Sequence, residues 1–100
     1  MMKNLYNGFI RIHVLYHATE EQICGIDIIR ELKRHGYTVS PGTIYPILHK
    51  MNQDRLLTNH NEIVNGKRRI YYRATPQGKN VLEQAREKIK ELYDEVILNE

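Results

Sequence analysis

The sequence has little that points to secretion, membranes or disulfide bonds. It contains one cysteine, Cys24, and no tryptophan among its 100 residues. A single cysteine excludes an internal disulfide framework, so we expect a reducing compartment, the cytoplasm. No apolar run approaches the ~18–20 residues that cross a bilayer, and the N-terminus does not resemble a secretory signal. We therefore expect no membrane partner.

The chain also lacks the size and the residue patterns of an enzyme. Hydrophobic residues make up 41% of its 100 residues, and a chain of this length buries roughly two-thirds of its unfolded surface in one modest core. No carboxylate pair, glycine-rich phosphate loop or nucleophile with a nearby base stands out. We expect a single small unit that is not an enzyme and needs no cofactor.

Histidine offers one pattern that is compatible with a metal. His13 and His17 are four residues apart, which would place both on one face of a helix. Cys24 or His35 would have to complete such a site in the folded chain. Because there is no HExxH motif and no second cysteine, we expect ordinary, partly buried histidines and no metal site.

The net charge is small but unevenly distributed. It is +3, from 15 basic and 12 acidic residues. Residues 30–73 hold nine basic and three acidic side chains, a net charge of +6, whereas residues 76–100 hold four basic and six acidic ones, a net charge of −2. A positive middle region suits a polyanionic partner, and a solvated face with counter-charges is the open alternative.

The first predicted helix covers Lys3 to about His17. Apolar residues occupy most of its circumference, so one chain of this size cannot cover it fully and a second subunit is the expected cover. Its candidate dimerisation residues are Leu5, Phe9 and Ile12.

A second helix is expected before Gly36, which suits a helix stop. Residues 19–22 resemble a capping box, and the helix begins somewhere within residues 20–25. Its predicted buried face consists of Ile26, Ile29 and Leu32.

The third predicted helix covers residues 41–54. Ser40 followed by Pro41 gives an N-cap and a proline at the first helical position. Pro46 is expected to make the first turn irregular, because proline cannot donate to the preceding turn. The predicted buried stripe is Ile44, Leu48 and Met51.

A β-hairpin is expected over residues 57–74. Asn65-Gly66 is the preferred pair for a two-residue type I′ turn. Alternation along the second strand predicts that Tyr72 faces the core and Tyr71 the solvent. The first strand is polar and shows little alternation of its own, so it is predicted only because the turn requires a partner for the second strand.

The last predicted helix opens at Thr75-Pro76 and fills residues 76–100. Its apolar residues step by three and four, as in the seam of a coiled coil, which predicts dimerisation, with packing inside a single chain as the alternative. These seam residues are Leu82, Ala85, Ile89, Leu92 and Val96.

Together these elements predict a mainly α fold with a small β-hairpin. Residues 1–75 would form a winged helix-turn-helix domain, and residues 76–100 a C-terminal dimerisation helix of the same compact unit. The third helix can enter a major groove with its N-terminus facing phosphate, while the hairpin grips the flanking backbone. The predicted DNA contacts are Ser40, Gly42, Thr43, Tyr45, His49 and Lys50 in the helix and Lys67, Arg68 and Arg69 in the wing.

Two motifs in this order resemble those of a known family. Residues 40–46 (SPGTIYP) are similar to the recognition-helix motif of PadR transcriptional regulators, and residues 66–78 (GKRRIYYRATPQG) to their wing and the start of their C-terminal helix. The resemblance implies a dimeric winged-helix repressor that dimerises through the C-terminal and first helices. It also implies DNA contacts at Ser40, Gly42, Thr43, Tyr45 and the basic wing residues.

The chain departs from the family pattern at a few positions. Arg55 stands where the family usually has a glycine that closes the recognition helix, so it must adopt the left-handed conformation or end the helix differently. Ile26 stands where tyrosine is frequent. Some members bind aromatic drugs between tryptophans at the dimer interface, and this chain has no tryptophan.

The leading hypothesis is therefore a sequence-specific DNA-binding regulator, a dimeric repressor on a palindromic operator. A winged-helix module that contacts an acidic protein is the alternative. A small-molecule effector of unknown identity, bound between C-terminal helices, is a further hypothesis.

Overall fold

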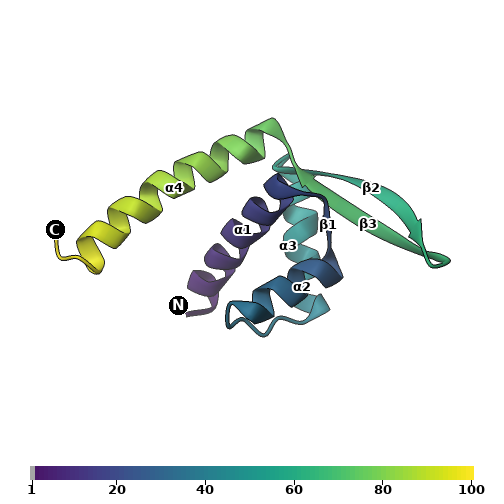
Figure 1. The fold of residues 1–100 in the computed structure, drawn as a ribbon, viewed down its shortest axis with the longest axis horizontal. Coiled ribbons are helices and arrows are strands. Elements are labelled where there is room, and N and C mark those ends of the chain that lie inside the picture. The colour runs from purple at the N-terminus through teal and green to yellow at the C-terminus, as the bar shows by residue number, and fades with distance from the viewer. Residues whose placement is uncertain (1) are drawn as a thin grey trace.

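The computed structural model describes residues 2–100 and contains four helices and a three-stranded sheet (Figure 1). The predicted mainly α fold with a hairpin is confirmed. A central body of three helices carries two projections, the β2–β3 hairpin at one end and the last helix at the other, and the long axis measures 53 Å against 20 Å for the shortest. The elements are α1 (Met2–Glu20), β1 (Ile23–Cys24), α2 (Gly25–Arg34), α3 (Pro41–Gln53), β2 (Leu57–Val64), β3 (Lys67–Ala74) and α4 (Pro76–Val96).

The core lies where α1, α2 and α3 meet the base of the hairpin. The predicted stripe of α3 is confirmed, since Ile44, Leu48 and Met51 are all buried. Burying such a side chain contributes about 1.5–3 kcal/mol, so these contacts fix α3 in the body and leave its opposite face free. The other fully buried side chains are Val14, Ile28, Leu32 and Leu57.

The sheet contains a strand that the sequence did not reveal. β1 has two residues and pairs with β3, with Ile23 opposite Tyr72 and Cys24 opposite Tyr71. The strand order is β1-β3-β2. Tyr72 is buried as predicted, while Tyr71 is half-buried because His60 stacks on it across the hairpin, with ring centroids 5.9 Å apart.

The predicted capping box at residues 19–22 is wrong. Thr19 remains in α1, where its hydroxyl donates to the Leu15 carbonyl at 2.8 Å, a bond that satisfies the side chain within the helix. The next residues must be extended to form β1, so α2 begins only at Gly25. Its capping residues are Cys24 and Asp27, whose carboxylate accepts from the Cys24 amide.

The predicted buried face of α2 is also partly wrong. Ile26 is 48% exposed, whereas Ile28 and Leu32 are fully buried. Because residues four apart share one face of a helix, Ile28 and Leu32 stand one above the other on the face toward the core. Ile29 is half-buried beside them.

Arg55 ends α3 in the left-handed conformation, with φ of 62°. Its amide donates to the Asn52 carbonyl and the Leu56 amide donates to the Met51 carbonyl. These are the two bonds of a Schellman motif, which glycine usually closes. Gly36 closes α2 in the same way, with φ of 90°. Of the two options, Arg55 thus adopts the left-handed conformation, at a cost of about 1–2 kcal/mol.

A tight joint fixes the start of α4. The Thr75 hydroxyl donates to the Arg55 carbonyl at 2.6 Å and accepts from the Gly78 amide at 3.0 Å. A Cβ atom at Gly78 would lie 2.1 Å from the Leu56 carbonyl oxygen, so only glycine fits there. The Thr75-Pro76 signal therefore caps α4 and also connects it to the end of α3. Among residues 2–100, no helix has the length and apolarity to cross a membrane.

Candidate nucleic-acid interface

The N-terminus of α3 is open to solvent. Ser40 is its N-cap, but its side chain makes no capping bond and lies 3.5 Å from the Thr43 hydroxyl. The Ser40 carbonyl accepts from the amides of Thr43 and Ile44, and Pro41 has no amide hydrogen to offer. Ser40, Gly42 and Thr43 are exposed. The Gly42 amide, two hydroxyls and the positive end of the helix dipole thus face the same solvent region, an arrangement suited to a phosphate.

Tyr45 has a packing role that sequence reasoning missed. A Cβ atom at Gly25 would lie 2.5 Å from Cε1 of the Tyr45 ring, so the ring rests on the first residue of α2. The Tyr45 side chain is nevertheless 37% exposed. Gly25 begins α2 and Tyr45 lies in α3, so their contact joins the two helices of the helix-turn-helix.

His49 and Lys50 lie further along α3 and are exposed. The Lys50 ammonium lies 3.2 Å from Oδ1 of Asp54, one turn later on the same helix. A surface pair of this kind is worth little and exchanges readily with solvent or another anion. Both side chains are therefore accessible to a ligand beside α3.

The wing ends in the predicted type I′ turn, with φ of 53° at Asn65 and 77° at Gly66. Lys67 and Arg68 are exposed and Arg69 is half-buried. Because side chains alternate along a strand, Lys67 and Arg69 occupy one face of the hairpin and Arg68 the other. The tip thus presents positive charge on both faces.

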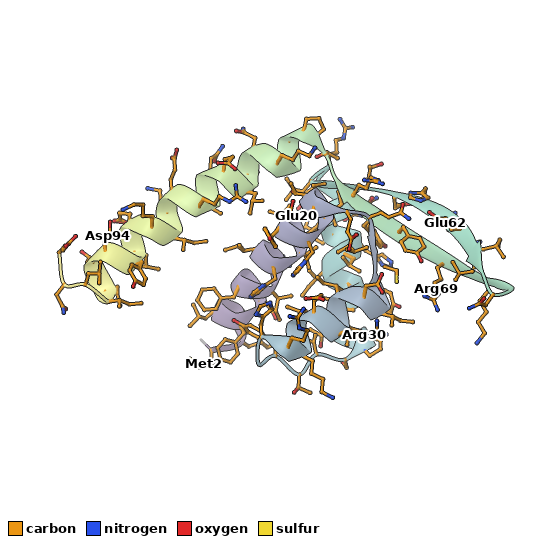
Figure 2. The ribbon with its side chains drawn as sticks, viewed as in Figure 1. Met2, Glu20, Arg30, Glu62, Arg69 and Asp94 are labelled. Atoms are coloured by element: carbon orange, nitrogen blue, oxygen red, sulfur yellow. The ribbon has the colours of Figure 1, made fainter. Side chains whose placement is uncertain are left out.

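A polar cluster below the tip was not predicted. Glu62 on β2 stands opposite Arg69 on β3, and Figure 2 labels both on the hairpin. One Glu62 oxygen lies 2.7 Å from Nε2 of His60 and accepts from Gln22 at 2.9 Å. These hydrogen bonds, first that of His60, lower the pKa of Glu62. The cluster ties the wing to the segment before β1, a contact between residues 40 positions apart that no local pattern indicates.

A second surface is apolar and lies on α4 and α1. In α4, Ile89, Leu92 and Val96 are 46%, 52% and 62% exposed, and Leu5 and Phe9 of α1 are exposed as well. Ala85 and Ile12 are half-buried. Leu82 differs from the other predicted dimerisation residues, because it is buried in the chain's own core.

An apolar hollow of about 550 Å³ lies between α1 and α4. Its lining includes Phe9, Ile12 and Tyr16 from α1 and Ile89 from α4. The outer part of α4 extends away from the body beyond this hollow (Figure 1), with Asp94 labelled near its far end in Figure 2. This surface is thus the counterpart of the wing, at the opposite end of the molecule.

The fold and these surfaces define a winged-helix DNA-binding protein, and comparison with known proteins specifies the family. Residues 14–84 match the profile of the transcriptional regulator PadR-like family. The chain is 42% identical to Transcriptional regulator Rv3488 of Mycobacterium tuberculosis over 96 residues, which cover 96% of this chain and 90% of that protein. The chain therefore belongs to the PadR-like family of transcriptional regulators.

Solved structures agree with this assignment. A PadR-like transcription factor from Bacteroides fragilis superposes with a TM-score of 0.85 at 27% identity, over 99% of this chain and 97% of that one. A PadR-like regulator from Bacillus cereus gives a TM-score of 0.79 at 31% identity, over 96% and 91% of the two chains. The predicted family resemblance is confirmed, as is the prediction of a DNA-binding regulator rather than an enzyme.

Proposed function

We propose that this regulator is a dimeric repressor that binds a palindromic operator. The N-terminal turn of α3 would meet phosphates and base edges in the major groove, and the wing would contact the flanking backbone. The observation that carries the proposal is the free N-terminus of α3, where two hydroxyls and an amide are exposed together. We expect the protein in the cytoplasm, because that is where a regulator of this kind would meet its operator.

The exposed apolar face supports the dimer. A single chain leaves Ile89, Leu92 and Val96 of α4 in water, and contiguous apolar patches on monomers are usually small or functional. A two-fold partner would cover this face with the same face of its own α4 and with α1. Two such chains would carry a net charge of +6 and present two α3 helices to one duplex.

We propose repression as the mode of action, because a dimer bound over a promoter blocks access to it without any further contact. Two-fold symmetry places the half-sites about one or two helical turns apart.

The test combines selection of bound sequences from the source genome with a native mass measurement. We expect a dimeric mass and an enriched inverted repeat located over promoters. Anisotropy titrations against an enriched fragment and a shuffled copy then measure specificity, which is typically about 10³-fold or more for such proteins. A monomeric mass, or equal affinity for both fragments, would contradict the proposal. Weak and non-specific binding would instead support a module that contacts an acidic protein.

A further inference from the structure

Three histidines from two separate segments meet beside α1. His13 and His17 lie on α1, and His35 is the C-cap residue of α2. Each offers a ring nitrogen, and these nitrogens all lie within 4.8 Å of one another. The rings of His13 and His35 are stacked, with centroids 4.9 Å apart. The sequence pairs His13 with His17 and leaves Cys24 or His35 as the third candidate, and the fold brings His35 to the pair.

The neutral imidazole is the form of histidine that binds metals. Burial lowers the pKa of His13, and the neighbouring His35 and His17 lower it further. The fold brings a ring nitrogen of each of the three histidines to one place. An alternative role as aromatic packing is open to His13, whose ring also meets Tyr37 edge-on at 5.6 Å. Aromatic packing alone, however, does not require a ring nitrogen of the half-buried His17 to lie close to the ring nitrogens of His13 and His35.

We propose that His13, His17 and His35 form a binding site for a divalent transition metal of the Zn²⁺ class. Imidazole ligands suit Zn²⁺, Cu²⁺ and Ni²⁺, whereas Mg²⁺ and Ca²⁺ prefer oxygen. With Zn–N bonds of about 2.0–2.1 Å, tetrahedral ligand nitrogens stand roughly 3.4 Å apart. The rings must therefore close inward by about 1 Å, and His35 must turn out of its stack with His13. His35 is exposed at the end of α2, so it is free to turn.

Neighbouring charges and access suit a cation. Oε2 of Glu31 lies 4.0 Å from Nε2 of His17 and also accepts from Arg34 at 2.9 Å. A carboxylate beside ligating histidines offsets the positive charge of a metal and orients the rings. The histidines line the hollow between α1 and α4, and the exposed side chain of His35 gives an ion access to the cluster. Arg86 lines the same hollow, but its guanidinium is paired with Glu83.

The position of the cluster connects the metal to DNA binding, a step that rests on the proposed function. α1 carries part of the proposed dimer surface, and His35 begins the turn that leads to α3. A metal held by both segments fixes the angle between the dimer surface and the recognition helix. Occupancy would therefore change how two α3 helices fit an operator, with an effect of at least about fivefold, as is typical of coupled sites.

The first experiment measures binding without DNA. Tag-free protein is stripped with a chelator, and its affinity for Zn²⁺ is measured by calorimetry, with the visible spectrum of bound Co²⁺ as a second readout. We expect one ion per chain and a loss of at least about tenfold in affinity for His17→Gln and for His35→Gln. His60→Gln, which alters a histidine of the wing, serves as the matched control and should bind as the original does. Equal affinity in all four proteins, or no binding in any, overturns the site.

The second experiment measures operator affinity with and without Zn²⁺ in each protein. We expect the metal to change the Kd for the original chain and for His60→Gln, and to leave His35→Gln unaffected. If Zn²⁺ binds but leaves the operator Kd unchanged, the site stands and its regulatory role is overturned. If no protein binds DNA specifically, the proposed function fails, and the calorimetry still decides the metal site. Thermal melting of each variant in chelator checks that its fold is intact.

Discussion

The two projections of this molecule differ in what they leave exposed. The wing ends in Lys67, Arg68 and Arg69 around a tight turn, whereas the outer half of α4 exposes Ile89, Leu92 and Val96. Both are long elements that leave the body, and neither could be stabilised by the core alone. The wing is held by its strand ladder and by the Glu62 cluster, and α4 by its joint at Thr75 and Gly78. One projection thus suits a polyanion, and the other suits a second copy of the chain.

The largest expected effect is on the apolar projection. Leu92→Glu places a charge in the proposed dimer surface of both subunits. In each subunit it also removes the stabilisation of about 1.5–3 kcal/mol that burial of the leucine side chain contributes to the dimer. We expect the dimer to weaken by at least about 100-fold, since every 1.4 kcal/mol changes the affinity tenfold. Sedimentation equilibrium measures this change.

Lys90→Gln is the matched control, because it alters the net charge equally on a different face of α4. Its side chain is 78% exposed and pairs with Asp94, so its loss should leave the dimer intact. If both variants dissociate alike, the charge of α4 rather than its apolar seam governs assembly.

The next prediction compares how cations of the wing and cations of α4 contribute to DNA binding. Arg68→Ala with Arg69→Ala should weaken binding to all sequences about tenfold to 100-fold and lower the slope of log K against log salt by about 0.9 for each lost phosphate contact. Titrations at several salt concentrations give the slope. Arg86→Ala with Lys90→Ala removes the same charge from α4 and should leave the slope unchanged. Equal slopes for the two double variants would remove the wing from the interface.

A third comparison uses the glycines of the two projections. Gly78→Ala should destabilise the fold by about 3 kcal/mol, because its Cβ atom would overlap the backbone oxygen of Leu56 at the joint of α4. Gly66→Ala at the wing tip meets no atom within 4 Å, and costs only about 1 kcal/mol for its left-handed backbone. Urea unfolding measures both. Similar losses in the free energy of unfolding would show that the backbone around Gly78 can shift to accommodate a Cβ atom, which would contradict a tightly packed joint.

These comparisons also separate what the sequence could reveal from what it could not. The helix α3 and the wing turn follow from local signals, Ser40-Pro41 and Asn65-Gly66, which act within a few residues. β1 has no such signal, because its two residues are extended only by pairing with β3. The capping pattern at Thr19 failed for the same reason, since the local preference yielded to that pairing.

The candidate sites divide in the same way. The exposed turn of α3 and the basic tip could be predicted from residue type and position. The contact of Tyr45 with Gly25 and the meeting of His35 with His13 required the packing of α2 against its neighbours. Leu82 has the spacing of the α4 seam but lies in the core, because the helix is attached to the body at that end. Helical spacing identifies a face, and only the fold shows what covers it.

The smallest effect concerns the polar cluster that braces the wing. Hydrogen bonds from His60 and Gln22 lower the pKa of Glu62 from its ordinary value of 4.5. A carboxylate whose pKa is lower in the folded state stabilises the fold above its unfolded pKa, and this contribution is lost as the pH falls through the folded pKa. The free energy of unfolding should therefore fall less between pH 5 and pH 3 in Glu62→Gln than in the original chain. Glu87→Gln, at an exposed site on α4, is the control and should retain the original pH dependence. If Glu62→Gln retains it as well, the cluster does not brace the wing, and the hairpin is held by its strand ladder alone.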